Sequence, residues 1–67
     1  MQVQLNGKDT LLRQHCVTVA DILAETPWKG RRVLVEVNGE VVPKDAYGVT
    51  RLSEGDRIEF VHFVGGG

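Results

Sequence analysis

The residues whose type and position suggest chemistry stand at the end of the sequence, in the segment "HFVGGG". An α-carboxyl group has a pKa of about 3.3–3.7, so the carboxylate of Gly67 is ionised at neutral pH. Three glycines make a thread without side chains and with wide freedom in φ. We expect Gly65 to Gly67 to form a flexible, slim tail that carries this carboxylate. The alternative is a frayed end without function.

Two histidines and one cysteine are the other residue types common in catalytic sites. Cys16 follows His15. Neighbours in a strand point to opposite faces, so we expect the two side chains not to pair and Cys16 to be a packed or half-exposed thiol. His62 precedes the tail and is interpreted first as a strand-surface residue, whose ring nitrogens would matter at a partner interface. The sequence shows no set of acid, base and nucleophile, so we predict no catalytic residue.

Length and composition exclude several classes of protein. The chain has 67 residues, eight basic and nine acidic side chains, and a net charge of −1. A domain of this size leaves little room for an enclosed catalytic pocket. The balanced charge lacks the basic footprint of a nucleic-acid binder. One cysteine permits no internal disulfide and no cysteine-rich metal site. No apolar run could span a membrane, and no signal peptide is visible, so we expect a cytoplasmic protein. We also expect no bound metal or cofactor.

Two Asn-Gly pairs predict the hairpins of a sheet. "MQVQLNG" alternates apolar and polar residues, with Val3 and Leu5 on one face, and Asn-Gly at 6–7 favours a primed hairpin turn. A second strand is expected over about 10–16. "RRVLVEVNGEVVP" repeats the pattern, with a strand over 33–37, Asn-Gly at 38–39 and a brief return strand that ends at Pro43.

A short helix separates these hairpins. In "TVADILAETP", Thr18 is a candidate N-cap with Asp21 three residues later, and the apolar residues follow at helical spacing. Pro27 cannot continue a helix, so the helix should run from Val19 to about Glu25 or Thr26.

A connecting segment and a long strand complete the domain. One helical turn is expected around Asp45 to Tyr47, followed by a strand from Arg57 to Val64 with Ile58 and Phe60 inward. The element order favours an α+β fold of the β-grasp (ubiquitin-like) type over residues 1–64. Its mixed sheet would have four to five strands, the last parallel to the first, with one helix on one face.

Three segments, "TVADIL", "VNGEVVP" and "EGDRIEFVHFVGGG", together resemble the ThiS family of sulfur carriers in thiamine biosynthesis, within the MoaD/ThiS superfamily. The resemblance covers nearly the whole chain. It is weakest around "LLRQHC" and "PWKGRR", and Cys16 is not part of the family pattern.

The resemblance implies that the protein is not an enzyme but a protein co-substrate. Gly67 would be adenylated by a ThiF-type enzyme that uses ATP, and then converted to a thiocarboxylate with sulfur from a donor such as a cysteine desulfurase. A ThiG-type thiazole synthase would take the sulfur. Gly65 and Gly66 would thread into these partners, spanning roughly 10 Å with Gly67. Phe63, Val64 and His62 are candidate partner contacts; for Phe63, capping the end of the core is an equal alternative.

Three other functions remain open from the sequence. The small subunit of molybdopterin synthase shares this fold and tail chemistry, although such chains are typically longer and often carry proline before the final glycines. A carrier that supplies sulfur for another metabolite is a further alternative of the same class. A β-grasp interaction domain with an inert tail is the alternative of a different class.

Overall fold

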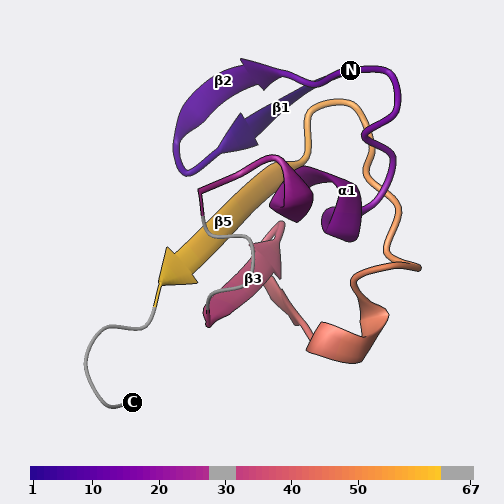
Figure 1. Ribbon diagram of the computed structural model, residues 1–67. Coiled ribbons are helices and arrows are strands. Elements are labelled where there is room, and N and C mark those ends of the chain that lie inside the picture. The colour runs from indigo at the N-terminus through magenta and orange to yellow at the C-terminus, as the bar shows by residue number, and fades with distance from the viewer. Residues whose placement is uncertain (28–31, 63–67) are drawn as a thin grey trace.

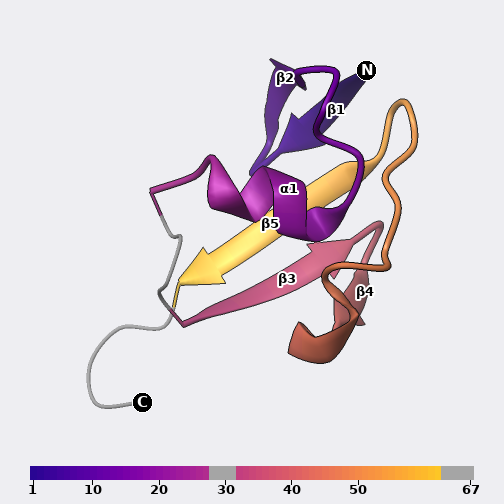
Figure 2. The same ribbon diagram turned by 45° about the vertical axis from the view of Figure 1, so that its right-hand side comes forward.

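The computed structural model describes residues 1–27 and 32–62 and shows one helix lying across one face of a five-stranded sheet (Figures 1 and 2). The elements are β1 (Gln2–Leu5), β2 (Lys8–Leu11), α1 (Val19–Ala24), β3 (Val33–Val37), β4 (Glu40–Val42), a short 3₁₀ turn (Lys44–Ala46) and β5 (Arg57–His62). The sheet order is β2-β1-β5-β3-β4. This architecture confirms the predicted mixed sheet with a single helix on one face.

The last strand, β5, lies between the two hairpins and joins them. It runs parallel to β1, with Gln4 opposite Arg57, and antiparallel to β3. Ile58 and Phe60 point inward and are buried, as predicted. Within the described residues, the core contains nine buried side chains from the sheet, the helix and the connecting loops: Val3, Cys16, Val19, Ile22, Val35, Val42, Leu52, Ile58 and Phe60.

Both Asn-Gly pairs form the predicted turns and also bind the central strand. Asn6 and Asn38 have φ values of 49° and 52°, and the glycine after each also has a positive φ, which a type I′ turn requires. The Asn6 side chain accepts a hydrogen bond from the N–H of Phe60 at 2.8 Å. Asn38 Oδ1 accepts one from the N–H of Arg57 at 2.9 Å. Each asparagine therefore shapes a hairpin and fixes that hairpin to β5.

The prediction for the second strand was wrong in its bounds. The expected strand covered 10–16, whereas β2 ends at Leu11, whose side chain is 80% exposed. At its end the chain turns, and the N–H of Cys16 donates to the carbonyl of Arg13 at 3.0 Å. β2 is an edge strand that pairs with β1 alone. The four residues of β1 therefore limit its length, and the chain must then leave the sheet to reach the helix.

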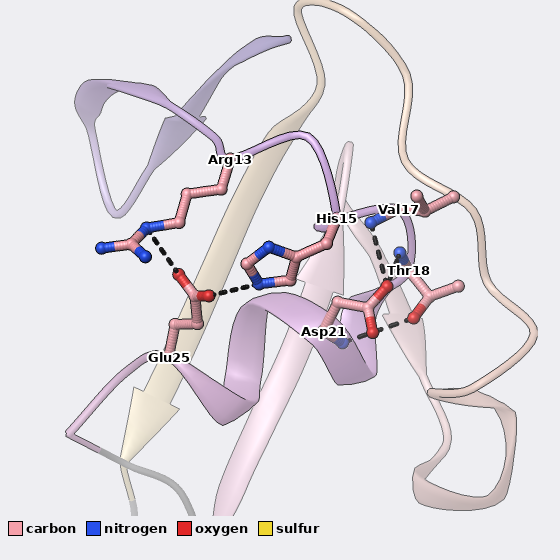
Figure 3. A network of polar contacts seen from close by, with 6 residues as sticks. All are labelled: Arg13, His15, Val17, Thr18, Asp21 and Glu25. Carbon is pink, nitrogen blue, oxygen red and sulfur yellow. Dashed lines mark hydrogen bonds and ion pairs between the residues drawn. The ribbon is translucent and has the colours of Figure 1, made fainter.

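The helix begins where the capping residues predict. Thr18 is the N-cap, and its hydroxyl accepts a hydrogen bond from the N–H of Asp21 at 3.3 Å. Asp21 Oδ2 in turn accepts from the N–H groups of Val17 and Thr18 at 2.9 and 3.0 Å (Figure 3). These backbone donors stabilise the ionised form and lower the pKa of Asp21. The helix ends at Ala24, with Glu25 as its C-cap, close to the predicted end.

Replacing Asp21 with asparagine is expected to lower the free energy of unfolding at neutral pH and to flatten its decline in acid. The pKa of Asp21 in the folded chain lies below the ordinary value of 3.8. Its contribution is therefore present above that value and is lost as the pH falls through the lowered pKa. Urea unfolding at neutral pH and at a series of acidic values measures this. Parallel pH curves for Asp21→Asn and wild type would contradict it.

Candidate functional site

The candidate site follows β5 in the sequence. The pairing of β5 with its neighbouring strands therefore fixes the point at which the tail begins. His62, the last residue of β5, is paired with Val33 of β3 and is half-buried. Alternation along β5 places His62 on the same side as the buried Ile58 and Phe60, so its interpretation as a strand-surface residue is not confirmed. Five consecutive residue pairs, from Val33–His62 to Val37–Ile58, hold β5 against β3. The chain after His62 therefore continues from the central strand of the sheet, which pairs with both β1 and β3.

The residues predicted to react and to thread lie outside the described part of the chain. These are Gly65, Gly66 and Gly67, together with two of the candidate contacts, Phe63 and Val64. Their roles, the flexible tail and the boundary at residue 64 stay predictions.

Beside the end of β5, the sheet face opposite α1 presents a surface that the sequence reasoning did not single out. We call it the outer surface, formed by Leu34, Glu36, Val41, Glu59 and Val61. Val61 lies opposite Leu34 and remains 46% exposed, while Glu59 lies opposite Glu36. Facing apolar side chains thus adjoin facing carboxylates. The alternation in β3 and β5 could have indicated this surface, because every second residue must face away from the helix.

The adjacent His15 and Cys16 do not form a nucleophile–base pair. They lie in the turn after β2 and not in a strand, so the prediction that strand alternation separates their side chains was wrong in its reason. The imidazole turns instead to the Glu25 carboxylate, with Nε2 2.5 Å from Oε2 (Figure 3). Cys16 is 3% exposed, which confirms a packed thiol. Burial, followed by the charge of Glu25, raises the pKa of this thiol, so it is a poor nucleophile at neutral pH.

The helices of the described residues are short. Within residues 1–27 and 32–62, no helix has both the length and the apolar character needed to cross a bilayer.

Comparison with known proteins gives consistent matches. The model of the ThiS family matches residues 2–67. The chain is 43% identical over 65 residues to the sulfur carrier protein ThiS of Bacillus subtilis, covering 97% of this chain and 98% of the relative. A crystal structure of the thiamine biosynthesis protein ThiS from Geobacter metallireducens superposes with a TM-score of 0.83 at 33% identity, and the match covers both chains completely.

Similarity extends to part of a larger protein. Over its full length the chain is 37% identical to a thiazole synthase of Paramagnetospirillum magneticum, but it spans only 20% of that relative. A thiazole synthase of Magnetococcus marinus matches with the same identity and coverage.

Proposed function

The chain belongs to the ThiS family, and on this basis we propose that it is a sulfur carrier of thiamine biosynthesis whose reactive group is the carboxylate of Gly67. The observation that carries the proposal is the 43% identity to a sulfur carrier protein over 97% of this chain. A domain of this size has little room for a catalytic pocket of its own. We therefore propose that it carries the reactive terminus and that other proteins catalyse the reactions.

The chemistry of the tail follows from the weak reactivity of a carboxylate. A carboxylate is a poor electrophile, so an oxygen of Gly67 first attacks the α-phosphorus of ATP, forming an acyl adenylate and releasing pyrophosphate. A persulfide then displaces AMP and gives an acyl disulfide. Attack by a thiol on the donor's sulfur, the one not bonded to the acyl carbon, breaks the S–S bond, releases the thiocarboxylate and leaves a disulfide on the donor side. ATP is thus consumed with the activating partner and is not a bound cofactor of this chain.

Three kinds of partner follow from these steps. A ThiF-type enzyme adenylates Gly67, a donor such as a cysteine desulfurase supplies the persulfide, and a ThiG-type thiazole synthase accepts the sulfur. The similarity to two proteins named thiazole synthase supports the last of these. We propose a cytoplasmic carrier, because ATP is available there for the adenylation step, and we propose no nucleic-acid or membrane partner.

The partner enzymes would hold the chain at the end of β5. Gly65 and Gly66 thread into the active site, while His62, Phe63 and Val64 contact its entrance. Val61 and Leu34 of the outer surface lie beside this point and offer apolar area. Glu36 and Glu59 offer negative charge next to it. A partner that binds both the tail and this surface would therefore present an apolar patch bordered by basic side chains.

Sulfur transfer to thiazole synthase tests the pathway. We expect the thiocarboxylated chain, mixed with thiazole synthase and its small-molecule substrates, to lose the mass difference of one oxygen-to-sulfur exchange as thiazole forms. The same chain is offered in parallel to the large subunit of molybdopterin synthase with its precursor. Transfer only in the second reaction would favour the molybdopterin role. Failure to form a thiocarboxylate at all would favour an interaction domain with an inert tail.

A further inference from the structure

Three side chains of different chemistry meet where the turn after β2 passes the end of α1. They are His15, Cys16 and Glu25, and each offers one potential ligand atom, all within 4.8 Å of one another. We propose that these three residues bind a divalent transition-metal ion, Zn²⁺, with water in the fourth position. This site is separate from the chemistry proposed for the glycine tail.

The donor set selects the class of metal. An imidazole nitrogen, a thiolate sulfur and a carboxylate oxygen are the three ligand types that Zn²⁺ uses in proteins. Mg²⁺ and Ca²⁺ require oxygen ligands almost alone. A set of three protein ligands leaves one tetrahedral position for water, as in open zinc sites.

The geometry requires only small side-chain movements. Zinc–ligand distances of about 2.0–2.3 Å place tetrahedral ligand atoms roughly 3.3–3.8 Å apart. His15 Nε2 and Glu25 Oε2, now 2.5 Å apart, must separate by about 1 Å to meet that spacing. Both side chains are accessible, 63% and 38% exposed, so they can rotate without disturbing the core.

Cys16 supplies the fixed ligand of the site. Its side chain belongs to the core, and its N–H donates to the carbonyl of Arg13, which sets the turn. A hollow of about 160 Å³ beside it, lined in part by Cys16, Ile22 and Glu25, gives access from solvent. Burial and neighbouring carboxylates raise the pKa of the thiol in the metal-free chain. A bound dication reverses this balance, because a coordinating thiol loses its proton.

Arg13 already orients the carboxylate that would serve as the third ligand. Its Nε lies 3.8 Å from Glu25 Oε1, while Oε2 faces His15 (Figure 3). One oxygen can thus stay with the guanidinium as the other turns to the metal. Groups that hold a ligand in this way commonly strengthen a metal site.

Cobalt spectroscopy and thermal melting test the proposal. Co²⁺ added to the reduced, metal-free chain is expected to produce a thiolate-to-cobalt charge-transfer absorption and the visible bands of tetrahedral Co²⁺, both removed by equimolar Zn²⁺. Zn²⁺ should also raise the melting temperature, because it binds the folded state. In Cys16→Ser the charge-transfer absorption should vanish. In His15→Gln and Glu25→Gln the affinity should fall at least about tenfold.

If Cys16→Ser fails to fold, His15→Gln and Glu25→Gln still test the proposal, because both side chains are exposed and their replacement leaves the core intact. His62→Gln, which alters the other histidine of the chain, is the matched control and should bind the metal as wild type does. An absent charge-transfer absorption in wild type would overturn the proposal. Equal affinity in wild type, His15→Gln and Glu25→Gln would do so too, leaving an ordinary ion pair beside a buried thiol.

Discussion

Deletion of Gly67 is expected to abolish formation of the thiocarboxylate and to leave the fold intact. Adenylation requires the terminal carboxylate to approach the α-phosphorus of ATP within about 3–3.5 Å. Removing one residue from an extended thread moves that group by roughly 3.3–3.6 Å, which exceeds the tolerance of a positioned reaction. Among the described residues the buried core runs from Val3 to Phe60, so we expect the fold to form without Gly67.

The measurement is mass spectrometry after incubation with the adenylating enzyme, ATP and a sulfur donor. Wild type should gain the mass of one oxygen-to-sulfur exchange. A chain extended by one alanine after Gly67 is the matched variant, since it displaces the carboxylate by the same step in the opposite direction and should also fail. Circular dichroism establishes that all three chains are folded. Efficient loading of the shortened or the extended chain would remove the basis for assigning the reactive group to Gly67.

Replacement of Ile58 by aspartate should unfold the domain. Ile58 is 1% exposed and lies in the central strand, where Leu5 and Val37 are its neighbours in register. Losing a buried isoleucine side chain costs about 2–5 kcal/mol, and an unpaired buried carboxylate adds to this. A chain of 67 residues has a total stability of only roughly 3–10 kcal/mol, so the sum is close to the whole.

Thermal melting followed by circular dichroism measures the effect, with Val61→Asp as the matched control. Val61 lies on the same strand, three residues further on, but faces outward and is 46% exposed. The same new carboxylate there remains hydrated, so the melting temperature should fall far less. Similar melting temperatures for the two variants would show that the inward face of β5 had been assigned incorrectly.

Local signals in the sequence were sufficient to predict most of the fold. Thr18 and Asp21 determine where α1 starts, and the Asn-Gly pairs at 6–7 and 38–39 fix both hairpins, because each signal acts through hydrogen bonds or dihedral angles of nearby residues. The pairing of β5 with β1 was predicted from the element order and from handedness. The end of β2 was not predictable locally, because it depends on the length of its single neighbour.

The side-chain clusters were harder to foresee than the fold. His15 and Glu25 are ten positions apart and meet only because a turn passes the end of a helix, so no spacing rule connects them. The outer surface likewise combines residues from three strands whose register the sequence does not specify. For the candidate tail site, the prediction depended on the resemblance to the ThiS family, because the glycines alone are also consistent with a frayed end.

The position of β5 between the hairpins has a consequence for how the chain is made on the ribosome. Synthesis proceeds from the N-terminus, and β1 has only β2 to pair with until residues 57–62 have emerged. Partners so distant along the chain close slowly, because the long intervening loop must first be ordered. Before that point β1 and β3 each lack the neighbour that β5 provides in the folded sheet. Since the glycines follow β5 in the sequence, an activating enzyme meets a complete tail only after the last strand required for folding has been translated.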